Sequence, residues 1–190
     1  MVGRKRHDDI STPKGCWGTP WKLYKFLDKD VGGFDADAAA NAGNAKHPVY
    51  FSESMNALKI DWQETIEKKN AKFFLNPDYA KGVIDKFVAK AREEAREGAT
   101  VTCLLPLSVD TGWWNKHVMA NDGKVAVEIR FIEGRVKFVG HTKSGELITD
   151  SPPFCSCVVK FCHWHEHYWN QDRHPVLPIL APTIVLRELK

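Results

Sequence analysis

The chain has 190 residues, of which 43% are hydrophobic and 27% are charged, and this fits one sizeable folded domain. An apolar share of this size excludes collagen-like, low-complexity and disordered polyelectrolyte sequences. No apolar run approaches the roughly 18 residues of a membrane span, and the basic residues 1–6 lead into polar residues rather than an apolar signal core. We therefore expect a cytoplasmic protein without membrane association.

Net charge and cysteine content exclude only a few classes of protein. The formal charge is +3, from 27 basic and 24 acidic residues, which is less basic than a dedicated nucleic-acid coat but suits an enzyme that visits nucleic acid briefly. The five cysteines contain no C-x-x-C pair, which argues against a disulfide scaffold or a zinc ribbon. Reduced thiols in a reducing compartment are the expectation.

The amino-terminal part predicts a polar arm and then a helix. Residues 1–14 are expected to be a flexible arm, because they are polar and broken by proline and glycine. The helix is expected to have Thr19 as its N-cap and Pro20 at its first position, and to stop before the glycines at 32–33. The elements expected after it are a strand at 34–37, a helical turn at 38–42 and a strand at 49–51.

The middle of the chain has the clearest pattern. A short apolar run at 72–75 ends at Asn76-Pro77, which predicts a strand. Apolar residues at helical spacing predict a helix over 83–95 that stops at Gly98, and residues 100–105 predict a second buried strand. Strand, helix and strand in this order predict a right-handed parallel unit, and ligands bind at the carboxyl ends of such strands.

The last third predicts antiparallel strands. A strand at 125–132 is expected to turn at Glu133-Gly134 into a strand at 135–139, followed by a polar stretch and a strand at 154–161. No regular structure is expected from His163 onward. The expected organisation is an arm at 1–14, one domain at 15–162 and a tail at 163–190.

The tetrapeptide Asn76-Pro77-Asp78-Tyr79 suggests chemistry. An exocyclic amine such as adenine N6 is a poor nucleophile because its lone pair is delocalised, and a protein assists by accepting both N–H hydrogens. The Asn76 side-chain oxygen and the Pro77 carbonyl are suited to this, while Tyr79 offers a stacking face for a base flipped from a duplex. Taken alone, the tetrapeptide is more often an ordinary turn followed by an aromatic residue.

In its context the motif resembles the phage Dam-type DNA N6-adenine methyltransferases. The resemblance extends from Trp17 to about Phe161. It rests on segments in the family's order, namely WGTP at 17–20, FDADAAA at 34–40, NAK at 44–46, DW at 61–62, FLNPDY at 74–79, LLP at 104–106, DTGW at 110–113, GRVKF at 134–138 and PF at 153–154. Each segment alone is unspecific, and their order and spacing make the resemblance specific.

The resemblance implies a single-domain α/β sandwich of the S-adenosylmethionine-dependent methyltransferase type, with a mostly parallel, Rossmann-like sheet and an antiparallel C-terminal hairpin. It also implies S-adenosylmethionine as cofactor and double-stranded DNA as partner, with no obligate protein partner, in the cytoplasm of a bacterial host. Asn76, Pro77 and Tyr79 would hold the target base. The residues that would contact the cofactor are Trp17, Thr19, Pro20, Asp35, Asp37, Asp61, Trp62 and Asn76.

One position departs from the family's Asn-Pro-Pro-Tyr pattern, because its third place is Asp78. The accepting carbonyl belongs to Pro77, so the hydrogen-bonding atoms are retained. Losing the second proline loosens the backbone, however, and a carboxylate is unfavourable near phosphates. The alternative function is therefore a catalytically impaired, methyltransferase-like DNA-binding protein.

Several candidate residues also have structural explanations. Asp35 and Asp37 could be paired catalytic carboxylates, although a cofactor anchor at a strand end is favoured. A solvated turn remains open for Asp37. Asp61 could instead cap a helix, and Trp62 could be core.

The basic and Cys/His-rich parts of the last third have alternatives too. Arg135, Lys137 and Lys143 are candidate phosphate contacts, with a solvated hairpin as an equal explanation, and loops at 108–124 and 139–152 are expected to read DNA. The Cys/His-rich stretch at 155–167 lacks the usual zinc spacings. We therefore expect buried thiols and no metal, and a metal-binding module is the least favoured alternative.

Overall fold

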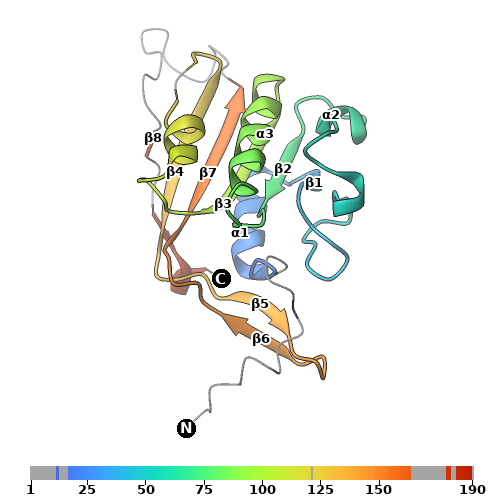
Figure 1. Cartoon of the computed structure of the whole chain (residues 1–190), viewed down its shortest axis with the longest axis vertical. Helices are drawn as coiled ribbons and strands as arrows, with labels where there is room; N and C mark the ends of the chain where they lie inside the picture. Colours follow the sequence, from blue (N-terminus) through green and yellow to red (C-terminus); the bar gives the residue numbers. More distant parts are fainter. Residues whose placement is uncertain (1–11, 13–16, 121, 164–178, 181–182, 190) are drawn as a thin grey trace.

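The structure is a computed structural model that describes residues 12, 17–120, 122–163, 179–180 and 183–189. It has one large sheet with helices on both faces and a two-stranded hairpin that extends from it (Figure 1). The helices are α1 Trp21–Val31, α2 Trp62–Thr65 and α3 Ile84–Arg96, with single turns at η2 Glu53–Met55 and η5 Leu186–Glu188 and a π-helical turn at η3 Trp114–Val118. The strands are β1 Ala36–Asp37, β2 Lys72–Leu75, β3 Thr100–Pro106, β4 Val125–Glu133, β5 Phe138–His141, β6 Leu147–Asp150, β7 Ser156–His163, β8 Ile179–Leu180 and β9 Ile184–Val185. In the described part of the chain, no helix has the length and apolar content needed to cross a membrane.

The large sheet is mostly parallel with one reversed strand. Its order is β1-β2-β3-β7-β4-β8, and β9 also pairs with β4. β1, β2 and β3 are parallel, while β7 runs antiparallel to both of its neighbours, β3 and β4. This confirms an α/β protein with a mostly parallel sheet, and the predicted parallel unit of β2, α3 and β3 is confirmed as well.

The predicted hairpin between 125–132 and 135–139 is wrong. β4 pairs with β7 rather than with the next strand, and β5 pairs with β6 in a separate two-stranded sheet. The apolar alternation of Cys157, Val159 and Phe161 explains the difference, because all three side chains are buried on one face and secure β7 in the centre of the sheet. The antiparallel strand is therefore internal, and the local hairpin β5–β6 lies outside the large sheet.

Two apolar layers cover the two faces of the sheet. Alternate strand side chains, such as Phe73 and Phe74, point to opposite faces. Phe73 packs in the cluster that includes α3 and η3, and Phe74 packs in the cluster that includes α1. In α1 the buried residues are Leu23, Tyr24 and Leu27, at the spacing expected of one helix face.

The amino-terminal predictions are correct in outline and wrong in detail. α1 begins one residue later than predicted, with Pro20 as the N-cap, and no side chain caps its first turn. The predicted helical turn at 38–42 is absent, because Ala38 and Ala40 instead donate backbone hydrogen bonds to Phe74 and Phe51. The predicted strand at 49–51 is reduced to one bridge, between Asp37 and Tyr50.

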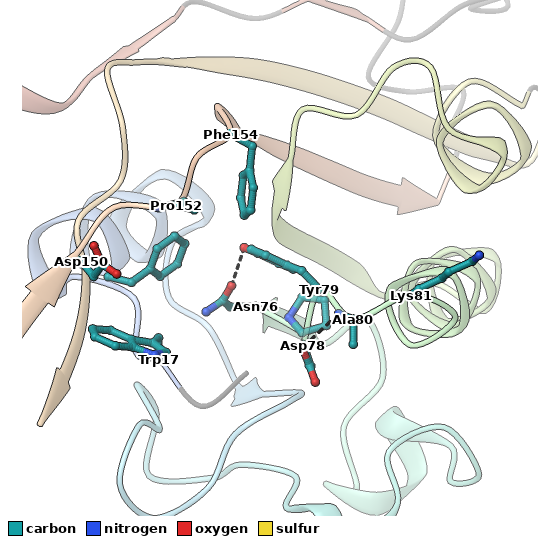
Figure 2. Close-up of a pocket in the computed structure, with 11 residues that line it drawn as sticks. Trp17, Asn76, Asp78, Tyr79, Ala80, Lys81, Asp150, Pro152 and Phe154 are labelled. Carbon is teal, nitrogen blue, oxygen red and sulfur yellow. Dashed lines mark hydrogen bonds between the residues drawn. The ribbon is translucent and has the colours of Figure 1, made fainter. Parts of the chain in front are cut away.

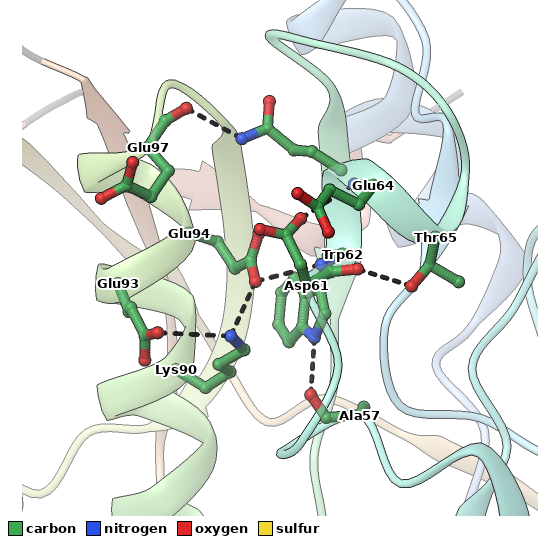
Figure 3. Close-up of polar contacts among 10 residues, drawn as sticks. Ala57, Asp61, Trp62, Glu64, Thr65, Lys90, Glu93, Glu94 and Glu97 are labelled. Carbon is green, nitrogen blue, oxygen red and sulfur yellow. Dashed lines mark hydrogen bonds and ion pairs between the residues drawn. The ribbon is translucent and has the colours of Figure 1, made fainter.

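The segment around α2 is held by α3 (Figure 3). The Trp62 indole is fully buried and donates to the Ala57 carbonyl at 2.7 Å, while the Trp62 backbone N–H donates to buried Glu94 at 3.1 Å. Lys90 pairs with the same Glu94 oxygen at 2.9 Å. A buried carboxylate needs such partners, so this pair ties α2 to the core.

The carboxy-terminal predictions are partly wrong. The segments Ile179–Leu180 and Ile184–Val185, for which no regular structure was expected, pair in parallel with β4. Cys157 is buried as predicted, whereas Cys155 precedes β7 and is exposed. Among the described residues, no group of three or more His, Cys, Asp or Glu side chains could hold a metal ion. The predicted arm, apart from Thr12, and residues 164–178 lie outside the described residues.

Candidate active site

The functional side chains meet at one edge of the sheet. Because β1 and β2 are parallel, Asp37 at the end of β1 and Asn76 just after β2 come to the same edge. β7 runs the other way, so the residues preceding it, including Phe154, also reach this edge. The carboxyl ends of parallel strands are where α/β proteins bind ligands.

The segment at 17–20, before α1, covers this edge and is hydrogen-bonded to strand β5 of the β5–β6 hairpin. Gly18 and Val139 exchange two backbone hydrogen bonds, each of 2.8 Å. At Gly140 a Cβ would lie 2.8 Å from the Trp17 ring, so the ring packs directly on the β5 backbone. Only glycine allows this approach, and it fixes Trp17 beside Asn76.

A cavity of about 670 Å³ opens at this edge. Its walls come from three parts of the chain, which are the loop after β2, the hairpin, and the Trp17 and Phe154 segments (Figure 2). Tyr79 makes edge-to-face contacts with Phe154 and Phe138, with ring centroids 5.7 and 6.3 Å apart. Aromatic walls with a few polar groups suit a flat heterocycle.

Tyr79 also orients the Asn76 amide. Its hydroxyl lies 2.7 Å from the Asn76 Oδ1 atom and 2.9 Å from the Leu104 carbonyl, and its single proton is shared between these acceptors. Burial raises the pKa of the Tyr79 phenol well above its usual value, so the hydroxyl keeps its proton. An amide oxygen accepts two hydrogen bonds, so Asn76 retains one acceptor position for a ligand in the cavity.

The loop after Asn76 is held by Asp78. Pro77 is buried, and the exposed Asp78 side chain accepts a hydrogen bond from the Ala80 backbone N–H at 3.0 Å. This contact two residues along the chain is the usual way in which an aspartate stabilises a turn. The departure at Asp78 therefore does not leave the turn without support.

A second, small hollow lies beside Asn76 and Trp17. Its volume of about 10 Å³ corresponds to about one water molecule, and its polar wall includes Thr19, Asp37 and Lys46. The Thr19 hydroxyl is buried, with 1% of the residue exposed, and has no hydrogen-bond partner among the described residues. Buried polar atoms normally have partners, so this hydroxyl is available to hydrogen-bond a group that enters the hollow.

Asp37 is the buried charge of this hollow. Its carboxylate accepts from the Lys46 backbone N–H at 3.0 Å and from the Ala39 N–H at 3.4 Å, and only 2% of the residue is exposed. Burial raises the pKa of Asp37 to about 6, although these N–H groups favour the ionised form. A cation bound here would favour the ionised form of Asp37 further.

Other predicted cofactor residues lie away from both hollows. Asp35 precedes β1 and binds Lys68 at 2.6 Å and the Lys72 backbone N–H at 2.9 Å, and these contacts outweigh burial and lower its pKa. Asp61 caps α2 by accepting from the Glu64 N–H at 2.8 Å. Trp62 is core, as described above, and Pro20 starts α1. Neither hollow is lined by these four residues, and a cofactor role for them stays a prediction.

The predicted DNA contacts lie near the β5–β6 hairpin, which forms one wall of the large cavity. Arg135 and Lys137 are exposed in the connection between β4 and β5 rather than on a strand, and Lys143 is exposed in the β5–β6 turn. The Arg135 guanidinium donates to the carbonyl of cavity-lining Pro152 at 3.3 Å. Contact with DNA stays a prediction for all three residues.

Sequence reasoning missed the site roles of Lys46, Phe138 and Phe154. Lys46 and Phe154 lie within segments of the family resemblance, which was the available signal for them. Phe138 shares such a segment with Lys137, but its place in the cavity depends on the pairing of β5 with β6. Local sequence carries no signal for that pairing.

The fold is mixed α/β, and its mostly parallel sheet contains the antiparallel strand β7. This architecture is consistent with a methyltransferase fold. A family model described as DNA N-6-adenine-methyltransferase (Dam) matches residues 9–177. The chain therefore belongs to the Dam family, which confirms the resemblance found in its sequence.

A curated relative is similar to part of the chain. It is the DNA N-6-adenine-methyltransferase of Escherichia phage T1, which is 30% identical over 118 residues. The match covers 60% of this chain and 47% of the relative, so the chain spans about half the length of the curated relative that it matches.

Proposed function

We propose that this protein transfers a methyl group from S-adenosylmethionine to the N6 amine of adenine in double-stranded DNA. The observation that carries the proposal is the Asn76 side-chain oxygen, which Tyr79 orients at the wall of an aromatic cavity. Family membership supports the same reaction. The fold we propose is accordingly that of an S-adenosylmethionine-dependent methyltransferase, acting in the cytoplasm of a bacterial host, because the similar protein comes from a phage.

The chain's own residues would prepare the adenine. The base would leave the duplex and enter the cavity beside Tyr79 and Phe154. The free acceptor position of Asn76 and the Pro77 carbonyl would take the two N6 hydrogens, which directs the nitrogen lone pair outward. As the N6–carbon bond forms, the sulfur–methyl bond breaks, and the surplus N6 proton passes to water. Groups already oriented toward the developing charge lower the barrier without rearranging.

The residues of the small hollow fit the cofactor. S-adenosylmethionine, when bound, supplies an electrophilic methyl group on its sulfonium, and it also carries an ammonium and a carboxylate. Asp37 would bind the ammonium, and the unpartnered Thr19 hydroxyl would gain a hydrogen bond. Trp17 and Asn76 line both hollows, so the cofactor and the base would lie next to each other at these residues.

DNA phosphates would be bound around the cavity. Lys81 lines the cavity, and Arg135 contacts its wall through Pro152. Lys137 and Lys143 are exposed on the hairpin side. Contacts of this kind position a duplex without reading its sequence.

The proposal is tested with the full chain, tritium-labelled S-adenosylmethionine and unmethylated duplex DNA of mixed sequence. We expect label in DNA and N6-methyladenine on nucleoside analysis, with no transfer to a duplex containing only guanine and cytosine. Cofactor at a hundredfold excess over its Kd should add roughly 2.7 kcal/mol of stability. Binding of both cofactor and duplex without transfer to any duplex would instead identify an impaired DNA-binding protein.

Asp78 decides between the active and the impaired protein. Because its side chain already supports the turn, we expect Asp78→Pro to change turnover by less than about threefold. Asp78→Asn keeps an acceptor for the Ala80 N–H and should also be close to neutral. The measurement is tritium transfer at saturating cofactor. A sharp rise in turnover for Asp78→Pro alone would show that the aspartate disables the site.

A further inference from the structure

Lys46 brings a positive charge into the small hollow. The Asp37 carboxylate fixes the Lys46 backbone N–H, at 3.0 Å. The Lys46 side chain extends over the Trp21 ring, with its Nζ atom 4.7 Å from the ring centroid. A Cβ at Gly18 would lie 3.1 Å from the same Nζ atom. The ammonium is therefore held between α1 and the segment that covers the site.

This ammonium has no anionic partner in the described part of the chain. No carboxylate oxygen there lies within 4.0 Å of the Lys46 Nζ atom, although Asp37 is close enough to favour its charge. Lys46 is half-buried, and burial lowers its pKa. The Trp21 ring stabilises part of this charge, and a bound anion would stabilise the partly desolvated ammonium further.

The hollow thus combines two opposite charges with an unsatisfied hydroxyl. Asp37 is suited to a cation, Lys46 to an anion and Thr19 to a hydrogen-bonding group. A free amino acid end carries an ammonium and a carboxylate on one carbon, and these match the two opposite charges that line the hollow. Phosphates and the sulfonium lack this pairing of charges.

We propose that Lys46 binds the carboxylate of the methionine part of the methyl donor, opposite Asp37, and so makes the protein selective for a cofactor with an intact amino acid end. The inference rests on the proposed function and names the end of the cofactor that this hollow receives. Lys46 acts in binding and touches no reacting atom. Its contribution therefore shows in cofactor affinity rather than in the methyl-transfer step.

The test is a calorimetric comparison of two ligands on two proteins. Wild type should bind S-adenosylmethionine about 10- to 100-fold more tightly than decarboxylated S-adenosylmethionine, because a hydrogen-bonded charge pair is lost. Lys46→Met should weaken binding of S-adenosylmethionine by a similar factor and leave binding of the decarboxylated ligand within about twofold. Lys25→Met, on the exposed face of α1, is the matched control and should behave as wild type.

A second variant keeps the test decisive if Lys46→Met does not fold. Gly18→Ala places a methyl group against the flexible end of Lys46 in the hollow that Gly18 lines, and it should weaken binding of the carboxylate-bearing ligand more than binding of the decarboxylated one. Equal affinity of wild type for both ligands would overturn the inference and leave the proposed function intact. Failure of wild type to bind either ligand would overturn the proposed function itself.

Discussion

Replacing Asn76 by alanine is expected to lower kcat for methyl transfer by at least about 100-fold, the usual loss when one preorganised hydrogen-bonding group is removed. The Asn76 oxygen is held by the Tyr79 hydroxyl at 2.7 Å, and it would accept one of the two N6 hydrogens. Without it, the N6 nitrogen keeps its planar, unreactive form for longer. Turnover is measured at saturating cofactor and DNA, so that altered binding does not enter the result.

The variant Asn76→Asp distinguishes the contribution of the side-chain oxygen from that of the amide N–H groups. The aspartate keeps an oxygen that can accept from Tyr79 and from the base, so this variant should retain more activity than Asn76→Ala. Both variants should melt near the wild-type temperature, because Asn76 is half-buried and Tyr79 keeps its contact with the Leu104 carbonyl. A kcat within tenfold of wild type for Asn76→Ala would contradict the proposed role, and the reverse order of the two variants would assign the role to the amide N–H groups.

Replacing Asp37 by asparagine is expected to weaken S-adenosylmethionine binding about 10- to 100-fold at pH 7.5, because the bound ammonium loses its charged partner. Burial raises the pKa of Asp37 to about 6 in the free protein, and a cation favours the ionised form. Wild-type affinity should therefore rise about tenfold between pH 5 and pH 7 and then level off. The Asp37→Asn variant should lack this rise, which calorimetry across the pH range measures.

The stability of the free protein should change in the opposite direction. Because the pKa of Asp37 is raised in the folded protein above its usual 3.8, its contribution to the free energy of unfolding is full below about pH 4. That contribution falls as the pH rises through about 6, by up to about 3 kcal/mol relative to Asp37→Asn. Denaturant unfolding of both proteins without cofactor provides the check. If wild type and Asp37→Asn bound the cofactor with equal affinity at pH 7.5, Asp37 would have no role in cofactor binding.

The unit of β2, α3 and β3 was predictable from the sequence because its signals are local. An apolar run ending at Asn76-Pro77, helical spacing over 83–95 and Gly98 each depend only on neighbouring residues. Gly98 has a φ of 104°, which favours glycine. The parallel arrangement then followed from chain connectivity. The place of Asn76 at the sheet edge was determined in the same way.

The tertiary structure alone decided which strands pair and which acidic residue lies in the site. β4 and the residues after Gly134 had the local pattern of a hairpin, but burial of Cys157, Val159 and Phe161 brought β7 beside β4 instead. Asp35 and Asp37 look equivalent in the sequence, yet Asp35 bonds to Lys68 and Lys72 while Asp37 is buried in the hollow. These outcomes depend on contacts between residues far apart in the chain, for which local propensity and spacing carry no information.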